Sequence, residues 1–294
     1  MKITAQQTDR LAAGIFKMAG WLSVVVLLSI FAMLLFNGAK AFFDIVPSSF
    51  FFGLHWNPAA YRQPQFGILS LVFSTLLVTL GAMLIAVPLG IGTAAYMAEF
   101  APRRVYQLIK PAVELFAGVP SVAVGFVGIT VVAPAIARIF GLGNGLNALN
   151  GAFLLALMSL PTIITVAEEA IRAVPQTFRE ASYALGATTQ KTLWRVTLPA
   201  AMSGILAAVM LGMGRALGET MTVLMATGNA SAFPHGFFDS VRTMTAAIAI
   251  ELGETAQGTT HYYALFAVGA VLFGISLAIN VLSEKIARRF RYKI

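Results

Sequence analysis

The sequence predicts an all-α polytopic membrane protein with six transmembrane helices, and three observations carry that prediction. Of the 294 residues, 58% are hydrophobic and only 11% are charged, whereas a soluble domain has about 25% charged residues. Six segments are long and apolar enough to cross a bilayer, because about 20 residues span its hydrocarbon core. The basic residues gather on one side of the membrane in the topology that these segments define.

The six expected spans differ in length. They cover about residues 18–39, 66–100, 114–136, 152–167, 199–226 and 262–282. The first apolar run is too long for the core of a signal peptide, which favours a span that is retained. The second is longer than one crossing needs, so we expect it to tilt or to extend beyond the bilayer. Pro88 and Pro161 are candidate kinks in the second and fourth spans.

Lysine and arginine residues lie mainly in the segments that share a side with the two termini. Fifteen of the 20 are on that side. The four on the other side are Lys40, Arg62, Arg138 and Arg242, and Arg215 lies within the fifth span. Because positive residues are enriched in cytoplasmic segments, we expect both termini and residues 175–199 to be cytoplasmic. Topology then explains the net charge of +8, and no nucleic-acid partner is expected.

Several classes of site have no counterpart in the sequence. The chain contains no cysteine, which excludes disulfides and thiolate metal sites. It contains no G-x-x-x-x-G-K-S/T loop, so we expect this chain not to bind and hydrolyse ATP by that route. His55, His235 and His261 lack metal-ligand spacing and are interpreted as solvated residues of the outer loops. We therefore expect no catalytic residue and no metal site, and the chain is not predicted to be an enzyme.

A polar loop precedes the fifth span. A helical run that ends at Leu185 meets Gly186, which can take the left-handed conformation that stops a helix. Thr188 or Thr189 can then cap a second short helix, expected to end at Pro199. Two short helices set at an angle predict a compact knob rather than a flexible linker.

Small residues recur every four positions along the fifth span. They are Ala200, Gly204, Ala208, Gly212 and Ala216. Gly214 and Gly218 add a G-x-x-x-G pair. Such spacing lets membrane helices approach closely, so ordinary packing in the bundle is expected to account for these residues.

The fifth span also contains charges. Arg215 and Glu219 stand one helical turn apart and could form a salt bridge along one face. An arginine near the membrane centre costs about 2.5–3.5 kcal/mol on insertion scales. This cost favours a role in a pathway, and a purely structural pair is the alternative. Glu114, near one end of the third span, is interpreted as an interfacial or inter-helix contact.

The polar loop matches a known motif. It resembles the EAA loop of ABC importer permeases. In that motif EAA is followed, after intervals of other residues, by a glycine, then by an isoleucine, and then by LP. The matching residues are Glu180, Ala181, Ser182, Gly186, Val196, Leu198 and Pro199. Serine for the second alanine and valine for isoleucine are mild departures.

The fifth span extends this resemblance. RALGE at residues 215–219 is similar to a motif of oxyanion permeases for phosphate, sulfate and molybdate. The longer GRALGETMTV at residues 214–223 most resembles the PstC-type permeases of phosphate importers. Further agreement lies in FAGVPS, LPTIITVAEEAIRAVP and HYYALF, at residues 116–121, 160–175 and 261–266. The resemblance covers nearly the whole chain after Gly67.

The resemblance implies a fold and two functional regions. It implies a type I ABC importer permease fold over residues 67–294, preceded by an N-terminal segment, residues 1–66, with the first helix and an outer loop. Residues 175–199 would form the coupling loop that docks on an ATP-binding subunit. Arg215, Glu219 and Thr220 would belong to the substrate pathway or its gate. The partner ATPase would bind ATP and magnesium, so no cofactor is expected on this chain.

The resemblance also implies a function and partners. The function is that of a permease subunit of an ATP-driven inorganic phosphate importer in the bacterial cytoplasmic (inner) membrane. The implied partners are a second, PstA-like permease, two copies of a PstB-like ATP-binding subunit, a periplasmic or lipid-anchored PstS-like phosphate-binding protein, and the lipid bilayer. Sulfate or molybdate import is the alternative within this class. Two alternatives come from other classes. One is a secondary transporter or channel, which the EAA-type loop argues against. The other is a membrane enzyme or assembly scaffold, for which no reactive constellation occurs.

Overall fold

The structure is a computed structural model that describes residues 5–289 of the chain, with side chains from residue 13 to residue 288. Lys2, Arg291 and Lys293, which the topology prediction counts among the basic residues, lie outside the described residues.

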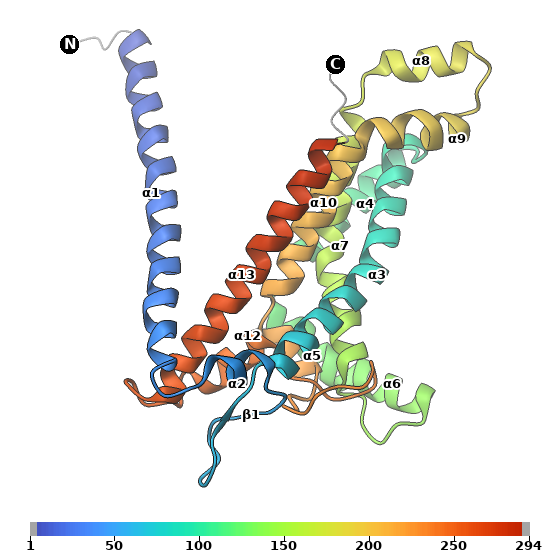
Figure 1. Ribbon diagram of the computed structural model, residues 1–294. Helices are drawn as coiled ribbons and strands as arrows, with labels where there is room; N and C mark the ends of the chain where they lie inside the picture. The colour runs from blue at the N-terminus through green and yellow to red at the C-terminus, as the bar shows by residue number, and fades with distance from the viewer. Residues whose placement is uncertain (1–4, 290–294) are drawn as a thin grey trace.

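Six helical segments of the described chain are long and apolar enough to cross a membrane, which confirms the predicted number. They run between two ends of the molecule (Figure 1). One end carries helices α8 (Gln176–Ala184) and α9 (Thr189–Thr192), and is called the α8–α9 end. The other carries strands β1 (Trp56–Asn57) and β2 (Gln65–Phe66), and is called the β1–β2 end. The six segments are Ala13–Ala41, Leu69–Glu99, Ser121–Phe140, Ala148–Arg172, Thr189–Gly218 and Thr260–Arg288.

Helix α1 (Ala5–Ala41) packs on α13 (Thr260–Arg289) near the β1–β2 end and diverges from it towards the α8–α9 end (Figure 1). Gly38 permits a close crossing, because a Cβ there would meet the backbone of Ala267 at 3.0 Å. Along the diverging part the side chains are exposed within this chain, and Trp21 is 64% exposed. The chain therefore leaves an apolar surface of its first span uncovered.

A short helix and a two-stranded hairpin follow α1 at the β1–β2 end. Helix α2 (Pro47–Phe52) starts with a proline, which suits the first turn of a helix. The strands pair antiparallel, with Trp56 opposite Phe66. Phe50 and Trp56 are buried against α13, in a core cluster that also contains Leu265. The hairpin is therefore fastened at its base to the membrane helices.

Helices α3 (Leu69–Glu99), α7 (Ala148–Arg172) and α10 (Leu198–Gly218) form the centre of the bundle. The small side chains of α10 make the packing possible, as the sequence predicts. A Cβ at Gly212 would come within 2.5 Å of Ile163, and one at Gly204 within 2.4 Å of the Cβ of Ala170.

The G-x-x-x-G pair of the same helix behaves differently. A Cβ added at Gly214 or at Gly218 would meet nothing within 4 Å in the described chain. These two glycines are therefore not needed for packing inside this subunit, and the expectation of ordinary bundle packing is wrong for them.

The third span differs from its predicted range, residues 114–136. The chain from Arg103 to Ala117 is a separate amphipathic helix, α4, whose last residues lie where the sequence predicts the start of the span. The extended backbone of Pro120 ends this segment, and the span follows as Ser121–Phe140. It consists of α5 (Ser121–Val127), the π-helical turn η1 (Gly128–Val132) and α6 (Ala133–Phe140). Glu114 therefore lies on α4, outside the spans.

The fifth span also differs from its prediction, residues 199–226. It begins at α9 and passes through the π-helical turn η2 (Leu193–Thr197) into α10, so the second short helix does not end at Pro199. It ends at Gly218, and a short helix α11 (Met221–Ala226) follows. Helix α12 (Met244–Glu251) precedes the last span.

Candidate functional site

Helices α8 and α9 form a helical hairpin with a defined turn. Gly186 has a left-handed backbone (φ +80°), as predicted, and ends α8 at no steric cost. The side chain of Thr188 accepts a hydrogen bond from the backbone N–H of Lys191 and so caps α9. A hydrogen bond of 2.9 Å between the hydroxyls of Ser182 and Thr192 joins the two helices. The compact knob expected from the sequence is confirmed.

The EAA-type residues occupy three distinct environments. Glu180 and Ala181 are exposed on α8, whereas Ser182 is buried between the helices. Gly186 forms the turn. Leu198 and Pro199 open α10, where Leu198 packs in a core cluster at the base of the hairpin. The motif therefore divides into an exposed part and a part that fixes the hairpin to the membrane helices.

Apolar side chains are uncovered on the α8–α9 hairpin and beside it. Leu185 is 89% exposed and Trp194 is 65% exposed. Exposed apolar surface of this kind typically marks a site that another protein or the membrane covers.

An ion pair joins the helical hairpin to the third helix of the bundle. The guanidinium of Arg179 on α8 lies 2.8 Å from the carboxylate of Glu99 at the end of α3. It also donates to the backbone carbonyls of Val174 and Ile171. These hydrogen bonds connect α8 to the end of α3 and to the backbone at the end of α7.

A buried carboxylate at the same end holds α4. Glu168 on α7 is 1% exposed and accepts hydrogen bonds from Lys110 (2.8 Å), from Tyr106 (3.2 Å) and from Arg172. Burial alone would lower the pKa of Lys110, but its hydrogen bond and charge interaction with Glu168 outweigh this effect and raise the pKa. Two cations thus surround one buried anion, and the excess positive charge is tolerated because the side chain of Arg172 is 46% exposed.

The fifth span breaks at one of its two charged residues. After Gly218, Glu219 has an extended backbone (φ −68°, ψ 130°), and helix resumes at Met221. The Glu219 carboxylate accepts hydrogen bonds from the backbone N–H groups of Thr220 (3.2 Å) and Thr222 (3.4 Å). Glu219 therefore caps the short helix α11 instead of continuing α10.

Arg215 lies on the last turn of α10 and is half-buried. Within the part of the chain whose side chains are described, it forms no hydrogen bond or ion pair. The salt bridge that Arg215 and Glu219 could form along one helical face does not occur among the described residues, because Glu219 lies beyond the end of the helix. A charged residue inside a membrane typically faces a cavity, a partner or a subunit boundary.

The broken segment is held in place from two sides. The hydroxyl of Thr222 on α11 donates to the carbonyl of Ser121, where the third span begins (3.0 Å). The hydroxyl of Thr245 on α12 donates to the backbone carbonyl of Glu219 (3.0 Å). Since a freed carbonyl is costly in a membrane, this second bond satisfies a group that the break leaves without a helical partner.

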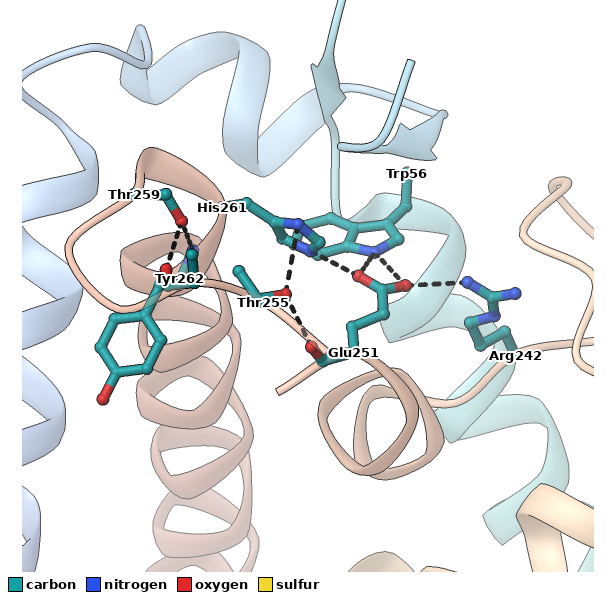
Figure 2. A network of polar contacts seen from close by, with 8 residues as sticks. Trp56, Arg242, Glu251, Thr255, Thr259, His261 and Tyr262 are labelled. Carbon is teal, nitrogen blue, oxygen red and sulfur yellow. Dashed lines mark hydrogen bonds and ion pairs between the residues drawn. The ribbon is translucent and has the colours of Figure 1, made fainter. Parts of the chain in front are cut away.

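The other end of α12 lies in a polar network (Figure 2). The indole N–H of Trp56 donates to both carboxylate oxygens of Glu251, at 3.0 and 2.9 Å. Arg242 and His261 contact the same carboxylate at 2.9 and 2.7 Å. Thr255 donates to the backbone carbonyl of Glu251 and lies 3.4 Å from the His261 ring. One carboxylate thus joins the β1–β2 hairpin, α12 and the start of α13.

The sequence analysis missed this network. It interpreted His261 as a solvated residue, which is wrong, because the ring is largely buried and bound to Glu251. His55 and His235 are exposed, as expected. The available signal was Glu251 itself, a carboxylate that ends an otherwise apolar helix and therefore needs polar partners.

Comparisons with known proteins agree with this architecture. The family described as "Binding-protein-dependent transport system inner membrane component" matches residues 86–292. The chain is 35% identical to "Phosphate transport system permease protein PstC" of Mesorhizobium japonicum, over 90% of this chain and 86% of that protein. It is 36% identical to "Probable ABC transporter permease protein YqgH" of Bacillus subtilis, over 91% of this chain and 88% of that protein.

Solved structures share the fold. A chain of a bacterial alginate ABC transporter, in complex with an alginate pentasaccharide-bound periplasmic protein, superposes with a TM-score of 0.62 at 17% identity and covers 96% of both chains. A chain of the inward-facing MetNI methionine ABC transporter superposes with a TM-score of 0.61 at 18% identity, over 76% of this chain and 96% of that chain. The six-helix architecture is thus that of type I ABC importer permeases, and the chain belongs to the family of binding-protein-dependent transport system inner membrane components, in which it resembles the PstC proteins over most of its length.

Proposed function

We propose that this chain is one of the two permease subunits of an ATP-driven importer of inorganic phosphate. The observation that carries this proposal is the 35% identity to a PstC protein over 90% of the chain. The substrate is carried over from that relative. The membrane bundle, the exposed α8–α9 hairpin and the charged break in the fifth span are compatible with it.

The proposed complex contains three further kinds of subunit. A second, PstA-like permease completes the pathway, and the uncovered surface of α1 and the open Gly214–Gly218 face support such a neighbour. Two PstB-like subunits bind ATP and magnesium, and this chain binds no cofactor. A PstS-like protein delivers phosphate. Residues 67–294 serve as the transmembrane domain and residues 1–66 as its N-terminal extension.

The α8–α9 hairpin is the proposed coupling element. Its exposed face, with Glu180, Ala181 and Leu185, docks on an ATP-binding subunit, while Ser182 and Leu198 keep it rigid. A rigid hairpin transmits displacement to α10, because α9 continues into that helix. In this proposal the α8–α9 end and both termini face the cytoplasm of a bacterium.

Arg215, Glu219 and Thr220 form the proposed gate region. A helix rises about 1.5 Å per residue, so Arg215 lies about 24 Å from Pro199, beyond the middle of the bilayer. Broken membrane helices commonly provide substrate sites, since their ends expose backbone groups. The Arg215 fork can donate charge-assisted hydrogen bonds to an oxyanion. Glu219, as the cap of α11, keeps the break in shape.

The proposal is tested by reconstituting this chain with its partner permease, ATPase and binding protein in liposomes. We expect phosphate-loaded binding protein to stimulate ATP hydrolysis and phosphate uptake, and sulfate and molybdate to leave both at the unstimulated level. Stimulation by sulfate or molybdate instead would assign the chain to that anion. Phosphate uptake that continues without ATP would make it a secondary transporter or channel.

A further inference from the structure

We propose that the β1–β2 hairpin is a docking element for the soluble, substrate-carrying protein that delivers the anion. The inference rests on the proposed function and adds to it the surface that receives the delivery protein. It concerns residues 56–66 and the two clefts beside them, which lie at the end of the molecule opposite the coupling hairpin (Figure 1).

The loop between the two strands projects from the molecule. In Figure 1 it extends further from the α8–α9 end than any other part of the chain. Tyr61, in this loop, is fully exposed (101%), and the neighbouring Arg62 is exposed as well. Tyrosine and arginine are among the residues that most often dominate binding energy at protein interfaces. Here they stand uncovered where a protein approaching from that side would make its first contact.

The base of the hairpin is fixed while its tip is free. Trp56 is 1% exposed and bonded through its indole to Glu251, which also holds Arg242 and His261 (Figure 2). The antiparallel pairing of Trp56 with Phe66 ties the second strand to the first. Because both ends of the loop are held, fewer conformations are open to it and less conformational entropy is lost on binding, so this anchor favours recognition over a passive connection.

A cleft lies on each side of the hairpin. One, of about 580 Å³, lies between β1 and the α12–α13 loop and contains Arg242 and Glu254. The other, of about 630 Å³, lies beside β2 and contains Asp44 and His55. A ridge with two polar clefts suits the polar rim of a soluble protein. It suits lipid poorly, because acyl chains offer no partner for these charges.

The hairpin is also connected to the break in the fifth span. Helix α12 has Glu251, bonded to Trp56, at one end, and Thr245, bonded to the carbonyl of Glu219, at the other. This helix is eight residues long, and it joins the docking element to the proposed gate by direct contacts. A partner that seats on the hairpin would therefore press on the segment that carries Glu219.

Photo-crosslinking tests the contact in the complete complex. Benzoylphenylalanine in place of Tyr61 should give an adduct with phosphate-loaded binding protein. The matched control is the same probe at Leu185, which is 89% exposed at the opposite end and should give no such adduct. An adduct from Tyr61 to the second permease or to lipid alone would overturn the proposal and assign the hairpin to that neighbour.

Titration of the binding protein tests whether the contact contributes affinity. The double variant Tyr61→Ala, Arg62→Ala should raise the binding-protein concentration for half-maximal ATPase stimulation about tenfold or more. Hydrolysis without binding protein should stay unchanged. Arg138→Ala, at an exposed arginine of the same end, is the charge control and should cause no such shift. An unchanged titration, or an equal shift in the control, would overturn the docking role.

The two proposals fail separately. If the unmodified complex shows no stimulation by phosphate-loaded binding protein, the proposed function fails, whereas an adduct between Tyr61 and that protein still supports docking. If stimulation is normal and Tyr61 gives no adduct, only the docking inference is lost.

Discussion

Arg215 is the residue on which the proposed chemistry depends most. Its position on the last turn of α10 suits a cation, because the carbonyls at a helix C-terminus carry partial negative charge. Glu219 is close in sequence but is committed to the backbone N–H groups of Thr220 and Thr222. The two charges thus have separate tasks in the structure, one as an accessible cation and one as a cap.

Substitution of Arg215 by glutamine should therefore leave assembly intact and reduce phosphate uptake. Loss of a charge-assisted hydrogen bond worth about 1.5–3 kcal/mol corresponds to a decrease of about tenfold or more. Uptake of labelled phosphate, normalised to the amount of assembled complex, measures the effect. Arg138→Gln, at an exposed arginine outside the pathway, is the control and should transport normally.

The double substitution Arg215→Gln, Glu219→Gln separates the gate from a purely structural role of the two charges, which form no ion pair within the described chain. If the charges served only to balance each other in the assembled complex, removing both would restore assembly and uptake, since no unbalanced charge would remain. For a gate we expect no recovery. Rescue of uptake by the double variant would contradict the assignment of Arg215.

At the scale of elements, α4 shows that hydropathy alone does not locate the start of the third span. The apolar residues near its end continue smoothly towards those of the third span, so hydropathy alone joined them in one prediction. Pro120 separates them in the structure, and no residue of α4 is buried. The helix is held through Lys110 and Tyr106, which reach the buried carboxylate of Glu168.

We therefore expect Glu168→Gln to loosen α4. Removing the anion deprives Lys110 of its ion-pair partner and costs about 1–3 kcal/mol, less than for a fully buried pair because the lysine is partly exposed. Amide hydrogen exchange across residues 103–117 should speed up about tenfold or more. Glu169→Gln is the matched control, because the neighbouring carboxylate is exposed and should leave exchange unchanged. Equal protection of α4 in both variants would show that Glu168 does not hold it.

The membrane spans and most of the turns and caps could be predicted from neighbouring residues in the sequence. Contacts between residues far apart in the sequence could not. The six spans, the turn at Gly186 and the cap at Thr188 follow from hydropathy, glycine and threonine at defined positions. The end of α10 at Gly218 was missed, because the capping bonds of Glu219 become visible only once α11 is placed.

The network around Glu251 was missed for a different reason. Its carboxylate binds Trp56, which lies 195 positions earlier in the chain. A single sequence contains no pattern that relates two positions so far apart. The sequence thus predicts where the α8–α9 hairpin turns, but not what holds the opposite end together.

At the scale of the whole molecule, the two ends differ in character. The α8–α9 end has a mainly polar helical hairpin with Leu185 exposed at its turn, and the β1–β2 end has a projecting hairpin beside a polar cleft. The uneven distribution of basic residues predicts which of them is cytoplasmic.

Cysteine labelling tests that orientation, because the chain contains no cysteine of its own. Thr189→Cys, at the exposed start of α9, should react with an impermeant thiol reagent only after the cytoplasm is opened. Ser231→Cys, in the loop between α11 and α12, should react in intact cells. The unmodified chain is the blank. Labelling of both positions from the same side would refute the placement of a single crossing between them.

The π-helical turn η2 lets the fifth span hold one extra residue without a change in the angular phase between its two halves. A π-turn closes its hydrogen bonds five residues apart rather than four, so it accommodates one residue more than an α-turn. Each residue of an α-helix turns the following chain by about 100°. Loss of one residue within 193–197 could therefore be absorbed as regular α-helix, and the segment would stay continuous. The helical hairpin would then keep nearly its present direction relative to Arg215, whereas loss of one residue from the regular part of α10 before Arg215 would turn it by about 100°. The chain length at η2 can thus vary by one residue without redirecting the hairpin.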